Sequence, residues 1–311
     1  MKTQKIKKIL ITGSSGTIGT RLFETLLERG YQVIGFDKTK NKWRKDLNEL
    51  TIIGDLLKKE DIRKIPKDIN LVIHLAANAR VFNLVKNPDL ALDNIKSTYN
   101  ILDFIRKNNI KNIIFPSSRE VYGNRKKLVS KEDDVDLTLC ESVYSASKIS
   151  GEVLIYSFAK CYDIKYIICR FSNVYGMYDT SERFIPILME RMKEGKDFEV
   201  FGKDKILDFT YIDDCIDGVI KCVENFNKAN GNTFNIAKGK GEKLLDIAKT
   251  IKKELNSKSK IVIGKSRKGE VIKYVADISK AKKVLKYNPK YSIKKGLELS
   301  LQWYSKIYGK K

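Results

Sequence analysis

The sequence predicts an α/β protein in which a doubly wound parallel sheet carries a second, smaller α+β lobe. Short β-branched runs alternate with longer amphipathic stretches through the first half of the chain, which is typical of βαβ units. We expect six strands at residues 8–12, 32–36, 51–54, 71–75, 112–115 and 166–169. We expect long covering helices at residues 17–28, 88–107 and 142–161.

After residue 170 the pattern is less regular and indicates a mixed lobe. The expected elements are a helix around 182–194, a strand near 198–201, a helix from Asp213, a strand at 233–236, and helices near Leu244 and Leu297. We therefore divide the chain into a sheet domain at 1–170, to which 206–236 return, and a second domain at 171–311. Such sheets bind ligands beyond the carboxyl ends of their strands, where the functional residues are sought.

The bulk composition is that of a soluble globular protein, with 42% hydrophobic and 32% charged residues among 311. No apolar run approaches the roughly 20 residues that cross a bilayer, and the start of the chain lacks the apolar segment of a signal peptide. The five cysteines include no Cys-x-x-Cys pair, so we expect free thiols in the cytoplasm and no metal site. The formal charge of +23 is spread without a nucleic-acid motif, so we expect a solvated surface and no nucleic-acid partner.

A glycine loop follows the first expected strand and opens the first expected helix. Glycines allow a pyrophosphate to approach the backbone, and the helix start supplies free N–H donors and partial positive charge. The spacing differs from the general Gly-x-Gly-x-x-Gly pattern, and an ordinary tight turn is the alternative. The residues expected to contact a dinucleotide here are Gly13, Ser15, Gly16, Thr17, Ile18 and Gly19.

Two carboxylates at later strand ends extend this candidate site. Asp37 ends the second expected strand, where it can accept hydrogen bonds from the adenosine ribose, and it favours NAD over NADP because it repels a 2′-phosphate. Asp55 and its neighbour Leu56 follow the third strand and are candidates for the adenine edge. A solvated turn explains Asp55 equally well.

Tyr144 and Lys148 lie four residues apart near the start of an expected helix, so both side chains share one face. A nearby ammonium group and an oxidised nicotinamide ring both favour the phenolate, which could take a proton from a sugar hydroxyl as hydride leaves the carbon. Ser118 follows the fifth strand and adds a third hydroxyl at the same edge. Taken alone, the Tyr-x-x-x-Lys pair is common on helix surfaces, and the alternative for Ser118 is a loop hydroxyl that hydrogen-bonds its own backbone.

Together these segments resemble the extended short-chain dehydrogenase/reductases, in particular the nucleotide-sugar epimerase/dehydratase branch and, within it, the UDP-glucose 4-epimerases. The resemblance covers nearly the whole chain through ordered motifs at 13–19, 74–77, 117–123, 144–148, 170–176 and 208–214, together with Asp37. It implies a Rossmann-type sheet domain that binds NAD and a second domain that binds a nucleotide-diphosphate sugar. It also implies a homodimer formed by the helices at 88–107 and 142–161.

The resemblance also implies roles for individual residues. Ser118, Tyr144 and Lys148 would form the catalytic trio, with Tyr144 as the base and Lys148 holding the nicotinamide ribose. The further cofactor contacts would be Ala76, Ala77, Asn94 and Phe171, and the substrate contacts would be Ser118, Asn173 and Arg267. One departure is Leu207, because the family usually has an arginine there as a second phosphate clamp.

Two reactions of this family begin alike and then separate. An epimerase lets a 4-keto sugar turn over and takes hydride back on the other face, whereas a 4,6-dehydratase also needs a carboxylate base and an acid. Glu120 matches the dehydratase base, but its neighbour Arg119 cannot donate a proton usefully. We therefore predict a nucleotide-sugar 4-epimerase, keep the 4,6-dehydratase as the alternative, and hold a non-catalytic NAD- or nucleic-acid-binding protein as a third hypothesis.

Overall fold

The computed structural model describes residues 6–266 and 269–308, and its central feature is a seven-stranded, wholly parallel sheet. This confirms the doubly wound α/β class. From edge to edge the strands are β11 (Asn232–Ile236), β7 (Lys165–Phe171), β5 (Asn112–Ser118), β4 (Leu71–His74), β1 (Lys8–Thr12), β2 (Gln32–Asp37) and β3 (Thr51–Ile53). The six expected strands are all present, and β5 and β7 run farther toward their carboxyl ends than expected.

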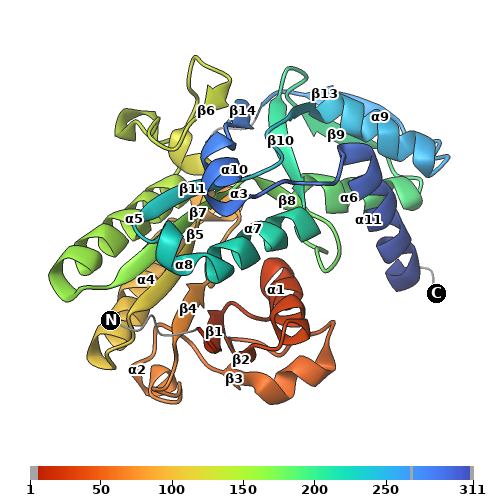
Figure 1. Cartoon of the computed structure of the whole chain (residues 1–311). Helices are drawn as coiled ribbons and strands as arrows, with labels where there is room; N and C mark the ends of the chain where they lie inside the picture. The colour runs from red at the N-terminus through yellow and green to blue at the C-terminus, as the bar shows by residue number, and fades with distance from the viewer. Residues whose placement is uncertain (1–5, 267–268, 309–311) are drawn as a thin grey trace.

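Helices cover both faces of the sheet, as Figure 1 shows. One layer contains α1 (Thr17–Glu28), α7 (Ile212–Glu224) and α8 (Phe226–Ala229), and the other contains α2 (Lys59–Ile62), α4 (Asp89–Lys107) and α5 (Val143–Tyr162). Side chains of β1 alternate between the layers. Ile9 and Ile11 belong to the core shared with α1, and Leu10 belongs to the core shared with α4. Burial on both faces explains why these strands are short continuous apolar runs.

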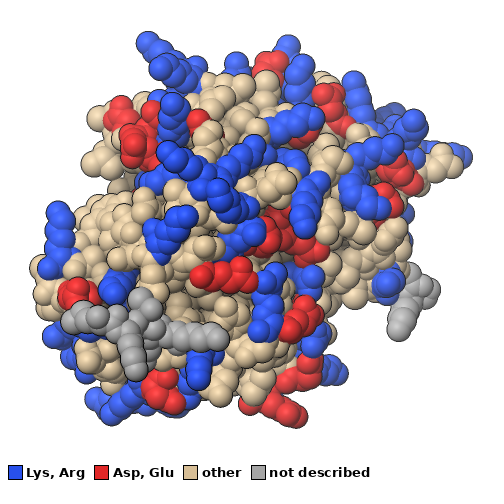
Figure 2. Space-filling model, in the orientation of Figure 1, with Lys and Arg blue, Asp and Glu red and all other residues tan. Residues whose placement is uncertain are grey.

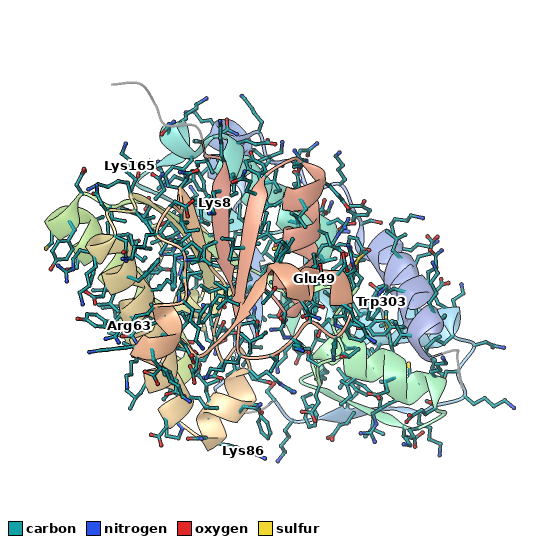
Figure 3. The ribbon with its side chains drawn as sticks, turned by 90° about the horizontal axis from the view of Figure 1, so that it is seen from below. Lys8, Glu49, Arg63, Lys86, Lys165 and Trp303 are labelled. Atoms are coloured by element: carbon teal, nitrogen blue, oxygen red, sulfur yellow. The ribbon has the colours of Figure 1, made fainter. Side chains whose placement is uncertain are left out.

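The order of the strands reverses between β1 and β4, because the chain builds β2 and β3 on one side and then β4, β5, β7 and β11 on the other. A crevice at the carboxyl ends of the strands is expected at this switch point. In Figure 3 Lys8 and Lys165, which begin β1 and β7, lie at one end of the sheet. Lys86, in the short helix α3 (Val81–Lys86), lies toward the opposite end, so α3 marks the carboxyl edge.

The second lobe is built around two small sheets. The first has the order β12-β10-β14-β6, with β8 pairing β10, and the second pairs β13 with β9. Its strands are β6 (Val129–Ser130), β8 (Asn173–Tyr175), β9 (Phe198–Phe201), β10 (Ile206–Tyr211), β12 (Gly241–Lys243), β13 (Ile261–Gly264) and β14 (Lys273–Ala276). Its helices are α6 (Phe184–Lys193), α9 (Leu244–Glu254), α10 (Ser279–Leu285) and α11 (Ile293–Tyr308). Most of these short strands were not expected, because two to four residues carry too little periodicity to be recognised.

The segment 206–236 is shared between the two parts of the fold. Residues 206–211 form β10 of the second lobe, whereas β11 pairs in parallel with β7 as an edge of the large sheet. The three short 3₁₀ turns are η1 (Lys45–Leu50), η2 (Arg119–Tyr122) and η3 (Leu137–Leu139). The domain boundary near residue 170 stays a prediction.

Basic side chains are spread over the face of the molecule that Figure 2 shows and do not gather in one patch. Acidic side chains lie among them. None of the helices within 6–266 and 269–308 has a stretch that is long and apolar enough to cross a membrane.

A buried ion pair fastens α5 to the large sheet. Arg170 of β7 donates two hydrogen bonds to the carboxylate of Glu152, at 2.9 and 2.7 Å, and both side chains are almost fully buried. Arg170 also donates to the Glu132 carbonyl oxygen at 2.6 Å. The pair fixes the helix that carries Tyr144 and Lys148 against the strand that ends at Phe171.

We expect Glu152→Ala to lower the free energy of unfolding by about 3 kcal/mol, because it leaves the Arg170 charge buried without its carboxylate. Urea unfolding measures this change. The matched control is Glu298→Ala, which removes an exposed partner of Lys295 and should cost less than about 1 kcal/mol. A loss below about 1 kcal/mol in Glu152→Ala would show that the pair does not hold the helix.

Candidate active site

The glycine loop at the start of α1 is packed too closely to accept side chains. Gly13 has φ +73°, and a Cβ there would lie 2.7 Å from the Ala76 backbone nitrogen. A Cβ on Gly19 would lie 2.1 Å from the Gly13 carbonyl oxygen. Gly16 begins the helix as its N-cap without a side-chain hydrogen bond. The first-turn N–H groups therefore have no side-chain cap and can receive an anionic ligand.

Asp37 lies directly beside this loop, as its position at the end of β2 predicts. Its carboxylate accepts hydrogen bonds from the Ser15 and Thr39 backbone N–H groups, both at 2.9 Å. The Ser15 hydroxyl donates to the Thr39 carbonyl oxygen at 2.8 Å. The glycine loop and the end of β2 thus form one connected wall at the switch point.

Asp55 and Leu56 follow β3 on the outer side of this wall. Asp55 accepts a hydrogen bond from the Leu57 N–H at 2.9 Å and forms an ion pair with Lys38 at 3.3 Å. The Leu56 carbonyl oxygen accepts a hydrogen bond from Asn100 of α4 at 2.7 Å. Both residues are structured turn residues, and neither forms a hydrogen bond to the glycine loop.

The β4 end connects the glycine loop to α4. The Ala76 N–H donates to the Thr12 hydroxyl at 3.3 Å, and Ala77 is the next residue along. His74 is buried, and its two ring nitrogens hydrogen-bond Thr12 at 2.7 Å and Thr98 at 3.2 Å. Burial and the charge of Lys148 lower the pKa of His74 to about 3, so the ring stays neutral and acts structurally.

Asn94 joins α4 to the helix that carries the Tyr-Lys pair. Its side-chain amide donates to the Ser147 hydroxyl at 3.2 Å and to the Asn78 carbonyl oxygen at 3.0 Å, and its oxygen accepts from the Asn78 N–H at 2.7 Å. All hydrogen bonds of this side chain therefore go to the protein. Asn94 fixes the chain after β4 against α5.

Ser118 and Tyr144 meet at the carboxyl end of β5. Both side chains are buried, and the Ser118 hydroxyl accepts a hydrogen bond from the Glu120 backbone N–H at 3.2 Å. Burial raises the pKa of Tyr144 above its ordinary value, whereas Ser118, Arg183 and Arg119 act to lower it. Without a bound cofactor, burial therefore affects the Tyr144 pKa more than these opposing groups do, and the neutral phenol is favoured.

Lys148 is buried one helical turn after Tyr144. Its ammonium group donates to the Pro116 carbonyl oxygen at 2.9 Å and lies 5.0 Å from the Phe115 ring centroid. Burial lowers the pKa of Lys148 to about 8, against a smaller opposing effect of Glu152. The i, i+4 spacing therefore brings two ionisable groups into one buried region, as expected.

Arg119 and Glu120 follow Ser118 in η2 and are both buried. The Arg119 Nη2 and Glu120 Oε1 atoms are 2.7 Å apart. Burial raises the pKa of Glu120, while Arg119 opposes this shift and Glu270 adds to it. Arg119 is unexpected beside a candidate base. Its buried charge is tolerated because Glu120 pairs with it.

Asn173 and Phe171 lie on β8 and at the end of β7, where the chain passes from the large sheet to the second lobe. Asn173 donates from its side chain to the Asp208 carbonyl oxygen at 2.9 Å, and Phe171 pairs in register with Ser118. Leu207 lies buried in β10, so the position of the missing arginine belongs to the core. Arg267 lies outside the described residues.

Residues 177–183 tie the second lobe to the loops around the glycine loop, a connection that no motif predicts. The ring centroids of Trp43 and Trp303 are 5.1 Å apart, so the same two parts also meet at the C-terminal helix α11, where Figure 3 labels Trp303. The connecting hydrogen bonds run from Thr17 to the Tyr178 carbonyl oxygen at 3.1 Å, from Lys42 to Thr180 at 2.8 Å, and from Arg80 to Glu182 at 2.7 Å.

Two sets of charged residues near the site were not predicted from the sequence. Arg183 is the N-cap residue of α6 and its charge lowers the pKa of Tyr144, although it lies 39 residues away in no recognised motif. Lys205 is buried and pairs with Glu270. Only the fold brings these residues to the site, and an isolated lysine in a lysine-rich chain gives no signal.

The loop fits a dinucleotide, since its glycines leave room for a pyrophosphate, uncapped N–H groups face it, and Asp37 stands where a ribose would lie. Phenol and ammonium groups move protons and cannot accept hydride. An enzyme that places Tyr144 and Lys148 at the same edge as a dinucleotide loop therefore belongs to the nicotinamide-dependent class.

The chain belongs to the NAD dependent epimerase/dehydratase family, which matches residues 9–237. It is 32% identical to a putative UDP-glucose 4-epimerase of Methanocaldococcus jannaschii, over 95% of this chain and 97% of that protein. The fold matches the UDP-glucose 4-epimerase of Thermotoga maritima with UDP-glucose, at 30% identity, TM-score 0.89 and coverage of 97% and 99%. It also matches the UDP-glucuronic acid 4-epimerase of Bacillus cereus with UDP-glucuronic acid and NAD, at 33% identity, TM-score 0.89 and coverage of 97% and 100%. The predicted family, enzyme class and cofactor are thereby confirmed.

The lowered pKa of Lys148 predicts how stability depends on pH. The ordinary pKa of 10.5 applies to the unfolded chain, so between about pH 8 and 10.5 the unfolded chain holds a proton that the folded protein has released. Stability therefore rises with pH in this window. Relative to Lys148→Met, the cofactor-free protein should gain about 1.5 kcal/mol between pH 8 and pH 9.5.

Urea unfolding at the two pH values measures this gain. Lys160→Met, which changes an exposed lysine of the same helix, should keep the pH dependence of the unaltered protein. An identical pH dependence in Lys148→Met and the unaltered protein would contradict the assignment.

Proposed function

We propose that the chain is an NAD-dependent 4-epimerase of a nucleotide-diphosphate sugar, with a UDP-hexose as substrate. The observation that carries this proposal is the burial of Ser118, Tyr144 and Lys148 at the carboxyl edge of the sheet, the edge at which the glycine loop also lies. The two solved relatives named above are 4-epimerases of UDP-sugars, which supports the nucleotide and the position of the reacting carbon.

The trio divides the proton chemistry among three groups. Tyr144 Oη takes the proton of the C4 hydroxyl and later returns it, and the Ser118 hydroxyl holds the same oxygen in place. Lys148 holds the nicotinamide ribose and favours the phenolate by its charge. Bound NAD supplies a reversible hydride acceptor at C4 and, in its oxidised form, an additional positive charge.

The cofactor and substrate contacts follow the walls of the site. Gly13, Gly16 and Gly19 let the pyrophosphate approach the α1 N-terminus, and Asp37 accepts the adenosine ribose hydroxyls. On the substrate side, Asn173 and Arg267 bind the sugar diphosphate. The other proposed cofactor contacts are Ser15, Thr17, Ile18, Asp55, Leu56, Ala76, Ala77, Asn94 and Phe171.

The arrangement of Glu120 favours epimerisation over elimination. A 4,6-dehydratase needs a carboxylate base and a separate acid, but one oxygen of Glu120 is ion-paired with Arg119 at 2.7 Å and the guanidinium cannot act as the acid. We therefore place Glu120 among the groups that shape the sugar pocket.

Incubation with UDP-glucose, followed by mass and NMR analysis, tests the reaction type. We expect a product of unchanged mass with inverted configuration at C4, and loss of one water would instead establish a dehydratase.

Tyr144→Phe should lower turnover by about 10²-fold or more while NAD stays bound, because only the proton acceptor is lost. Near-normal turnover in that variant would remove Tyr144 from its role.

We further propose that the protein is a cytoplasmic homodimer that pairs through α4 and α5. These helices pack together and expose Leu92, Tyr99 and Val153, whose side chains are 63%, 48% and 57% exposed. An apolar face of this kind suits a second copy of the same face under two-fold symmetry. Five free cysteines fit a reducing compartment.

Light scattering after size exclusion tests the pairing. The unaltered protein should have twice the mass of one chain, and Leu92→Lys combined with Val153→Lys should be monomeric. Val262→Lys, on an exposed position of β13, should stay dimeric. A monomeric unaltered protein, or a dimeric α4–α5 variant, would contradict the proposal.

A further inference from the structure

The segment that follows β5 contains polar atoms that are buried without a partner. Among the described residues, such atoms include Arg119 Nη1, Glu120 Oε2 and Ser117 Oγ. Arg119 and Glu120 are only 8% and 6% exposed, so water access does not explain their missing hydrogen bonds. Buried charged groups with free hydrogen-bonding positions are costly, which indicates that a ligand completes them.

Arg119 Nη1 and Glu120 Oε2 belong to one ion pair, in which the nitrogen lacks an acceptor and the oxygen lacks a donor. Arg119 Nη2 and Glu120 Oε1 bind each other at 2.7 Å, which leaves a donor N–H on Arg119 and an acceptor oxygen on Glu120. The Glu120 backbone N–H donates a hydrogen bond to the Ser118 hydroxyl at 3.2 Å, which places the pair directly beside a proposed catalytic residue. A ligand group that donates and accepts at once would satisfy both.

The charges around this pair cancel locally. Arg119 is paired with Glu120, and Lys205 is paired with Glu270, whose charges also act on Glu120. A carboxylate or phosphate could satisfy Arg119 but would lie against the Glu120 carboxylate. A hydroxyl group can donate to Glu120 and accept from Arg119 in the same position.

We propose that Arg119 and Glu120 recognise a hydroxyl group of the substrate sugar on a carbon flanking C4, so that they determine specificity for a sugar hydroxylated at that position. The proposal rests on the 4-epimerase function. Tyr144 must reach the C4 hydroxyl, and the substituents beside it are the C3 hydroxyl and the C6 hydroxymethyl group. One of these occupies the position between Arg119 Nη1 and Glu120 Oε2.

Substrates that lack single hydroxyls test this recognition. We would compare kcat/KM for UDP-glucose with the values for its 3-deoxy and 6-deoxy analogues. In the unaltered protein, one analogue should be slower by about 10²-fold, because removal of that hydroxyl leaves two buried groups unpaired. In Arg119→Met combined with Glu120→Met, which removes both charges together, this penalty should fall to within about threefold.

The ratio of two substrates in one variant does not depend on the fraction of folded protein. Glu120→Gln, which keeps the side-chain shape, should reduce the penalty at least about tenfold. The control is Arg125→Met with Asp134→Leu, which removes an ion pair of the same 2.7 Å length and should keep the full penalty.

Three outcomes separate the two proposals. Equal turnover of UDP-glucose and both analogues by the unaltered protein, or a penalty that persists in the Arg119 and Glu120 variants, would overturn the recognition of a hydroxyl by this pair. Epimerisation of none of the three sugars by the unaltered protein would instead overturn the proposed function.

Discussion

The burial of two ionisable side chains one helical turn apart is the constraint on which the rest of the structure depends. Tyr144 and Lys148 are both almost fully removed from water, and burial shifts their pKa values in opposite directions, each toward its neutral form. Such groups persist in an interior only when their environment is rigid and serves a function. The surrounding fold supplies this rigidity through the Arg170–Glu152 ion pair and the hydrogen bond between Asn94 and Ser147.

The same constraint explains the position of the site in the fold. The carboxyl ends of β1, β2, β4 and β5 bring the glycine loop, Asp37, Ser118 and the start of α5 to one edge. Residues 177–183 then connect the second lobe to this edge through Thr17, Lys42 and Arg80. Proton chemistry and dinucleotide binding therefore share one frame, and the second lobe adds charged residues such as Arg183 and Lys205 to it.

Six strands of the large sheet could be predicted because short β-branched runs alternate with amphipathic helices, and α1 was placed at its correct bounds. The glycine loop, Asp37 and the Tyr144–Lys148 pair could be located because their spacing has a direct physical meaning. Arg183 and Lys205 could not be located, since they meet Tyr144 and Glu120 only through long-range packing. The short strands β6, β8 and β12 likewise depend on partners distant in the sequence.

The central claim is that the positive charge of bound NAD converts a phenol with a raised pKa into a base. Ultraviolet titration of the protein, after subtraction of the Tyr144→Phe signal, measures the ionisation of this one tyrosine. The account predicts a pKa above the ordinary value of about 10 without cofactor and at least about one unit below it with saturating NAD. A Tyr144 pKa that stays above about 10 in the NAD complex would contradict it.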